Sequence, residues 1–268
     1  MDIELLQKRF GLMGARVRVG PAVGGHWGRG LRPEGINIRT DDEGEFFDIR
    51  LGAGGDRYEV VDVRPELRHL LLLARNEQGR KNKFLCGHDE RHWFVCAVPG
   101  ENVADVATAL EALQPVEVRR AVLGRVRRAK NRLRRRNEAF VRQGEWFFIP
   151  EPNLFVNEKL VHSSEPISRG AGSKPHMCQY LYRSGGESVM VCRRHPNGVT
   201  LAQYNQIIST QPGARHWGWQ QMRRNAGVYV RGRVWHPDHK TVVLDTWHRV
   251  LMNTEGQAPG RERVVFLD

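Results

Sequence analysis

The feature that most constrains the fold is an arginine-rich segment, residues 118–142, in which apolar side chains recur at helical spacing. Within residues 115–142, ten Arg and one Lys stand against two Glu, so the segment carries +9 of the chain's formal net charge of +12. On a helix the apolar side chains would share one narrow stripe and leave the charges outside it; this stripe comprises Val118, Val122, Val126, Ala129, Leu133 and Phe140. We therefore expect residues 115–142 to form one long basic amphipathic helix, with Pro115 at its start and Gly144 beyond its end.

Charge of this density indicates a polyanionic partner, and nucleic acid is the commonest one. The alternative is a solvated helix whose arginines pair with acidic residues elsewhere, for which the N-terminal region offers one patch: Asp41, Asp42, Glu43, Glu45 and Asp48. Like charges four residues apart, such as Arg128 and Arg132, destabilise a helix by a few tenths of a kcal/mol each. A purely structural linker has no reason to carry them.

Composition narrows the class of protein. Hydrophobic residues make up 40% of the 268 residues and include seven Trp, which indicates packed cores rather than disorder. No apolar run approaches the 18 residues that suggest a membrane span, and residues 1–10 do not resemble a signal peptide, so we expect a cytoplasmic protein with no membrane partner. The four Cys are expected in cores or as metal ligands. The glycines of residues 20–30 lack the GK[ST] of a phosphate loop, which argues against a nucleotide-driven motor.

The N-terminal part, residues 1–114, is expected to be an α+β domain. Apolar or alternating runs predict strands at 15–19, 37–39, 46–51 and 58–63, and two more around a polar turn within 81–99. Residues 69–75 fit either a strand or a helix. A helix capped by Asn102 is expected to close the domain.

The C-terminal part, residues 143–268, is expected to be β-rich. Its clearest pattern is a hairpin, 178–192, around the sequence Ser-Gly-Gly-Glu, followed by a short helix capped by Thr200. Two strands about residues 236–240 and a last strand at 263–268 complete it. The fold class is therefore α+β: two small mixed domains with mainly antiparallel strands, joined by the basic helix.

Four residues near the ends of the expected hairpin are candidate zinc ligands. Cys178 and Cys192 would face each other across the two strands, with His176 and His195 beside them. Two thiolates and two imidazoles suit tetrahedral zinc. Their spacing matches no standard zinc finger, and the alternative is a pair of buried cysteines with surface histidines.

Two further clusters are candidates for catalysis. His236 and His239 flank a Pro-Asp turn and His248 lies on the returning strand, so the three could ligate an ion or protonate a leaving oxygen, as in metal-dependent nucleases. The turn at residues 88–92 holds two His, an Asp and a Glu that could do acid–base work. In both places satisfied or solvated side chains are the alternative.

Aromatic and basic residues also interleave in residues 214–236, a pattern that suits single strands or RNA because bases stack on rings while arginines hold phosphates. Core packing is the competing explanation for the tryptophans. The expected nucleic-acid-binding residues are Arg120, Arg127, Arg128, Lys130, Arg134, Arg135, Arg142, Trp217, Trp219, Arg223, Arg224, Arg231 and Arg233.

Together these observations predict a nucleic-acid-binding protein, with RNA or single-stranded DNA favoured and zinc as a possible cofactor. The alternatives are a metal-dependent nuclease or phosphodiesterase and a protein-interaction scaffold. A protein partner in a nucleoprotein complex fits the same charge. The sequence leaves open whether the chain is an enzyme and what its oligomeric state is.

Overall fold

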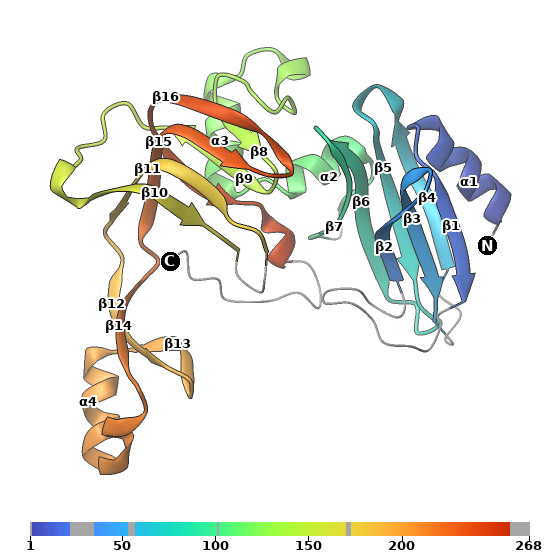
Figure 1. Ribbon diagram of the computed structural model, residues 1–268. Helices are drawn as coiled ribbons and strands as arrows, with labels where there is room; N and C mark the ends of the chain where they lie inside the picture. The colour runs from blue at the N-terminus through green and yellow to red at the C-terminus, as the bar shows by residue number, and fades with distance from the viewer. Residues whose placement is uncertain (1, 22–34, 53–56, 101, 170–172, 258–268) are drawn as a thin grey trace. The chain divides into compact units, whose positions relative to one another are not determined.

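The computed structural model describes residues 2–21, 35–52, 57–100, 102–169 and 173–257 (Figure 1). The chain divides into two compact units, Met1–Glu138 with Asn253–Glu262, and Ala139–Met252 with Arg263–Asp268. Each unit mixes helices with mostly antiparallel strands, so the α+β class is confirmed. The expected last strand at 263–268 lies outside the described residues.

The first unit contains two small sheets. In the three-stranded sheet, ordered β1-β3-β2, β3 pairs in parallel with β1 and antiparallel with β2. The four-stranded sheet is an antiparallel meander, β4-β5-β6-β7, and the run at 69–75 is one of its strands. The strands are β1 Val17–Pro21, β2 Gly35–Asp41, β3 Gly44–Leu51, β4 Arg57–Arg64, β5 His69–Arg75, β6 Lys81–Asp89 and β7 His92–Val98.

Strand β5 is a near-continuous apolar run and is buried on both of its faces, so both faces of the four-stranded sheet are covered. Leu70 and Leu72 pack with Phe10 of helix α1 (Ile3–Leu12), whereas Leu71 packs with α2 (Val106–Ala112). Helix α2 begins at Val106, not after Asn102, since Asp105 forms a capping box with Thr108. A 3-10 turn, Thr254–Gln257, returns the chain to this unit.

The basic segment is where the structure departs most from expectation. Helix α3 spans Val116–Arg125 only; Val126 is extended, and a 3-10 turn, Ala129–Asn131, is the one helical piece described between it and β8. The expectation of a single helix over 115–142 is therefore wrong. Val126 and Phe140 of the apolar stripe are nevertheless buried, so the segment docks through them without remaining helical. Repulsion between successive arginines, with Gly124 adding to the cost of continuing, accounts for the break.

The second unit is built on a six-stranded antiparallel sheet in the order β10-β11-β15-β16-β9-β8. Its core contains Trp146, Leu181 and Val230, all fully buried. The strands are β8 Val141–Gln143, β9 Trp146–Pro150, β10 Val161–Ile167, β11 His176–Ser184, β15 Gly227–His236 and β16 His239–Met252.

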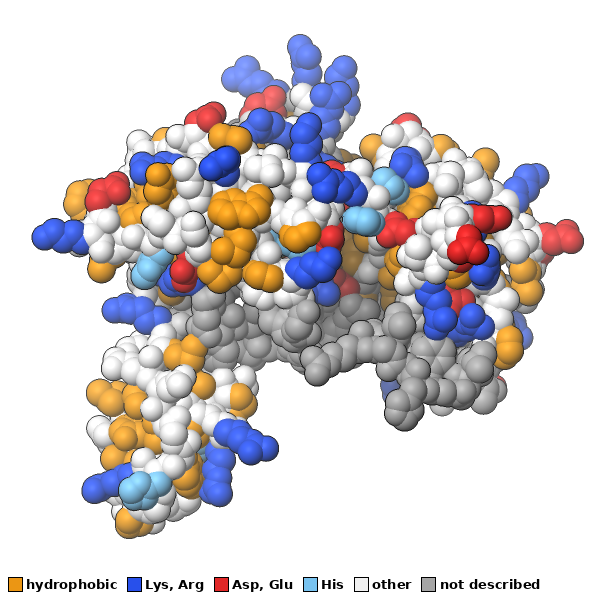
Figure 2. Space-filling model, in the orientation of Figure 1, with side chains coloured by type: hydrophobic (Ala, Val, Ile, Leu, Met, Phe, Trp, Pro, Cys, Tyr) orange, Lys and Arg blue, Asp and Glu red, His pale blue; other side chains and the backbone are white. Residues whose placement is uncertain are grey.

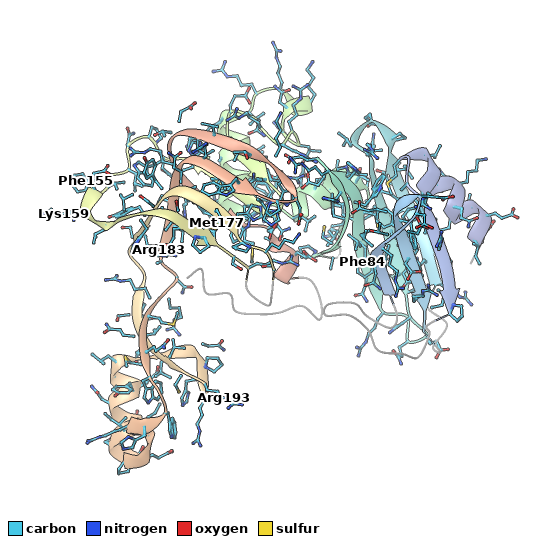
Figure 3. The ribbon with its side chains drawn as sticks, in the orientation of Figure 1. Phe84, Phe155, Lys159, Met177, Arg183 and Arg193 are labelled. Carbon is cyan, nitrogen blue, oxygen red and sulfur yellow. The ribbon has the colours of Figure 1, made fainter. Side chains whose placement is uncertain are left out.

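A ribbon extends from this sheet and carries a second, three-stranded sheet, β13-β12-β14 (Figure 1). Ser184 of β11 pairs with Gly227 and Glu187 of β12 pairs with Arg224, so the antiparallel register continues through Gly185 and Gly186. Figure 3 labels Arg183 near the upper part of this ribbon and Arg193 near its far end. Its elements are β12 Glu187–Cys192, β13 His195–Thr200, α4 Leu201–Thr210 and β14 Gln220–Arg224.

The expected hairpin around residues 184–187 is therefore wrong in its pairing. Both glycines have positive φ, and a Cβ on Gly186 would lie 2.8 Å from the backbone of Ala226. They form a joint between two ribbon segments, whereas the chain reverses between β12 and β13. The helix capped by Thr200 is confirmed.

In the described part of the chain, no helix is long and apolar enough to cross a membrane.

Candidate nucleic-acid interface and histidine cluster

We name as the basic surface seven of the exposed basic side chains on and after α3: Arg119, Arg120, Arg125, Arg127, Arg128, Lys130 and Arg134. Within the described residues, none of the seven makes an ion pair. Lys and Arg side chains stand out from the top of the view in Figure 2, where Figure 1 shows the green segment that follows α3. Their charged groups are therefore exposed to solvent.

The acidic patch of the N-terminal region is matched by other arginines. Asp41 accepts a hydrogen bond from Arg16 at 2.6 Å and pairs with Arg18 as well. The bond from Arg16 is the main reason that the pKa of Asp41 falls from 3.8 to about 2. The fully buried Asp48 lies 2.8 Å from Nε of Arg50. The idea that this patch neutralises the basic segment is therefore wrong.

The turn at residues 88–92 holds the acidic partners of one segment arginine. Arg135 is half-buried and pairs with Asp89 and, at 3.2 Å, with Glu90. His92 Nδ1 lies 2.8 Å from a carboxylate oxygen of Glu45. Charged groups of this turn thus pair with residues outside it, and Arg135, predicted to bind nucleic acid, serves an internal contact. Arg142, predicted with it, is half-buried on β8 of the second unit.

The predicted aromatic surface is split between the two sheets of the second unit. Trp217 and Trp219 belong to the ribbon's end, where both are half-buried and stack with His195 at centroid distances of 6.0 and 5.4 Å. The guanidinium of Arg194 lies 4.3 Å from the ring centroid of Trp217. The tryptophans therefore form the small core of the ribbon's end and keep part of their surface exposed.

The four arginines predicted to bind nucleic acid within residues 214–236 are also divided between the ribbon and the six-stranded sheet. Arg223 and Arg224 lie on β14; Arg224 pairs with Glu187 at 2.5 Å, whereas Arg223 is exposed and donates to the carbonyl of Gly185 at 2.9 Å. Arg231 and Arg233 lie on β15, and Arg231 covers the ring of Trp247 at 4.9 Å, whereas Arg233 is exposed. Arg223 and Arg233 thus retain the exposure that phosphate binding needs.

Three histidines meet where β11, β15 and β16 end or begin. Met177 of β11, labelled in Figure 3, lies opposite Trp235 of β15, which places His176 next to His236. His236 in turn pairs with His239 across the β15–β16 turn. The ring centroids lie 4.3 Å (176–236), 4.9 Å (236–239) and 5.2 Å (176–239) apart. One nitrogen of each ring lies within 4.8 Å of the others.

The interior position of this cluster affects its protonation. His176 is 1% exposed and the side chain of His236 is 6% exposed. Burial, with a smaller contribution from the neighbouring rings, lowers the pKa of His176 from 6.5 to about 3. The Asp238 amide donates to Nδ1 of His236 at 3.1 Å.

The sequence analysis correctly expected His236 and His239 to lie together, but the third histidine it expected beside them, His248, is not part of the cluster. His248 lies nine residues beyond His239 on β16, about 30 Å along an extended strand. Its Nδ1 contacts the carbonyl of Thr246 at 2.7 Å. His176 takes its place, and the signal for it is the β11–β15 register, which the sequence analysis missed by pairing β11 with β12.

The predicted Cys₂His₂ site is divided between the two sheets. His176 and Cys178 begin β11 in the six-stranded sheet, whereas Cys192 and His195 lie at the β12–β13 reversal in the ribbon. Burial raises the pKa of Cys178 to about 12, so its thiol is protonated at neutral pH. Among the described residues, the group of three or more possible ligands consists of histidines alone.

Comparison of the chain with protein-family models, curated proteins and solved structures finds no match.

Proposed function

We propose that the protein binds nucleic acid through the basic surface, with single-stranded RNA or DNA as the favoured ligand. One observation carries the proposal: the seven basic side chains are exposed and make no ion pair within the described part of the chain. Unpaired cations on one short segment repel one another, so binding an anion of matching charge density relieves this electrostatic repulsion.

The backbone of this segment favours a flexible strand over a duplex. Helix α3 has ten residues, and the remainder of the basic surface lies on an irregular chain that cannot enter a major groove as a rod. Arginines on such a chain can contact successive phosphates of a single strand. Trp217 and Trp219, half-buried on the ribbon, offer partly exposed rings that suit base stacking.

The test is a fluorescence anisotropy titration with labelled RNA, single-stranded DNA and duplex DNA, repeated at several salt concentrations. If each of the seven side chains contacts one phosphate of a single strand, a plot of log affinity against log salt concentration has a slope of about −5. The affinity should then fall about 10³-fold between 50 and 200 mM salt. A salt-independent affinity would overturn the proposal. Equal binding to polyglutamate would also overturn it, because the surface would then serve an acidic protein as well.

A further inference from the structure

The histidine cluster carries a second inference that does not depend on nucleic-acid binding. Both ring nitrogens of His176 are buried and have no hydrogen-bond partner within the described residues. The same is true of Nε1 of the fully buried Trp146, whose ring centroid lies 6.2 Å from that of His176. Buried polar atoms are nearly always bonded, and an imidazole bonded at neither nitrogen is unusual because one of them always offers a lone pair.

A third buried side chain near the cluster, Gln143, also has a polar atom without a hydrogen-bond partner in the described part of the chain. The side-chain amide nitrogen of Gln143 donates to the carbonyls of Val234 and Lys240, at 3.2 and 2.7 Å. Lys240 directly follows His239 in the sequence. Oε1 of Gln143 is buried without a hydrogen-bond partner in the part of the chain described. Unsatisfied polar atoms on three buried side chains at one place indicate that this place binds something beyond the protein.

The spacing of the three rings matches imidazoles that share one ion. With metal–nitrogen distances of about 2.1 Å, the centroids of three rings on a tetrahedral ion lie roughly 5 Å apart. The observed centroid distances are 4.3, 4.9 and 5.2 Å. The nitrogens, within 4.8 Å of one another, need to close to roughly 3.4 Å around such an ion. The His176 ring is nearly parallel to the other two, at 21° to each, so the His236 and His239 side chains must turn to direct their nitrogens at such an ion.

Neighbouring backbone contacts two of these rings. A Cβ on Gly144 would lie 2.7 Å from Nε2 of His239, so the absence of a side chain there lets the imidazole pack against the β8–β9 turn. Nδ1 of His236 accepts from the Asp238 amide at 3.1 Å, and the Asp238 carboxylate, which accepts from Lys174 at 3.0 Å, lies 4.0 Å from the same Nδ1.

We propose that His176, His236 and His239 bind one divalent transition-metal ion, with zinc as the expected occupant. Imidazole nitrogen suits Zn²⁺, Cu²⁺, Ni²⁺ and Fe²⁺, whereas Mg²⁺ and Ca²⁺ require oxygen ligands. Three protein ligands leave the fourth position of a tetrahedral ion for water. This site differs from the Cys₂His₂ site expected from the sequence, with which it shares His176.

The test uses the full chain, stripped with a chelator and titrated with Zn²⁺ by calorimetry and with Co²⁺ by visible absorption. We expect one ion per chain and the intense spectrum of tetrahedral Co²⁺. His239→Ala should weaken Zn²⁺ binding at least 100-fold, and Gly144→Ala should weaken it by displacing the His239 ring. Circular dichroism checks that each variant is folded. His236→Ala provides a second ligand variant if either of these fails to fold.

Two control variants separate this site from others. His162→Ala removes an exposed histidine from β10 of the same sheet and should leave Zn²⁺ affinity unchanged. The double variant Cys192→Ala, His195→Ala should also bind normally. The proposal is overturned if wild type binds no Zn²⁺, if a folded His239→Ala protein binds as tightly as wild type, if the Co²⁺ spectrum is octahedral, or if the Cys192 and His195 variant loses the ion.

Discussion

Neutralising the part of the basic surface that follows α3 should weaken nucleic-acid binding without destabilising the protein. The triple variant Arg127→Gln, Arg128→Gln, Lys130→Gln removes three of the seven exposed charges. Each phosphate contact on a single strand contributes about 0.7 to the log–log salt slope, so the slope should become shallower by about 2. Extrapolated from 1 M, this change corresponds to an affinity loss of about 100-fold at 0.1 M salt.

The assay compares this variant with wild type by anisotropy on one RNA at four salt concentrations, and a thermal melt is run on each protein. The control variant Lys8→Gln, Arg9→Gln, Lys81→Gln removes the same charge from exposed positions elsewhere in the first unit. Both variants should unfold within about 0.5 kcal/mol of wild type because their side chains are exposed. If the control variant loses as much affinity as the test variant, overall charge accounts for binding and the assignment of the surface is wrong.

Three further predictions concern the fold. Phe47→Ala should lower the free energy of unfolding by about 3–5 kcal/mol in urea titrations, since its fully buried ring packs on Phe10 at 5.0 Å; a loss under 1 kcal/mol would contradict this packing. Because the pKa of Asp41 is lowered to about 2, its pairing stabilises the fold above pH 3.8 and is lost as the pH falls towards 2. Asp41→Asn should therefore unfold with a weaker dependence on pH across that interval, and an unchanged pH profile would disprove the contribution. The buried thiol of Cys178, with its pKa raised to about 12, should react with a thiol reagent only on unfolding, which mass spectrometry of the labelled peptide will report.

Local patterns predicted most of the first unit correctly. The hairpin of β6 and β7 reverses at Glu90 and Arg91, in the polar turn expected within 81–99. Short connections of this kind are determined by residues close in sequence. The ambiguous run of β5 could not be resolved in the same way, because burial on both faces removes the alternation that distinguishes a half-buried strand.

The basic segment shows why periodicity alone was not sufficient. Val118, Val122 and Val126 are all buried as the helical stripe requires, but helix α3 ends at Arg125. Apolar anchors can be buried by an irregular chain as well as by a helix. The repulsion between arginines that argued for a polyanionic partner also opposes the helix, and the sequence analysis did not apply it to the backbone.

The second unit required information that the sequence does not display locally. Gly185 and Gly186 lie between two β patterns and resemble a hairpin turn, but they join two segments of one long ribbon. With that pairing mistaken, Cys178 was placed opposite Cys192 and His176 was separated from His236. Only the long-range pairing of β11 with β15 brings the three histidines together.

The central claim is that nucleic acid lies on the basic surface, and photo-cross-linking tests it most directly. A photoreactive single-stranded RNA is bound to the full chain at low salt, irradiated and digested, and the linked peptides are identified by mass spectrometry. The account predicts that cross-links concentrate in residues 119–134 and disappear when the salt concentration is raised. Cross-links confined to other parts of the chain, or cross-linking within 119–134 that is insensitive to salt, would contradict it.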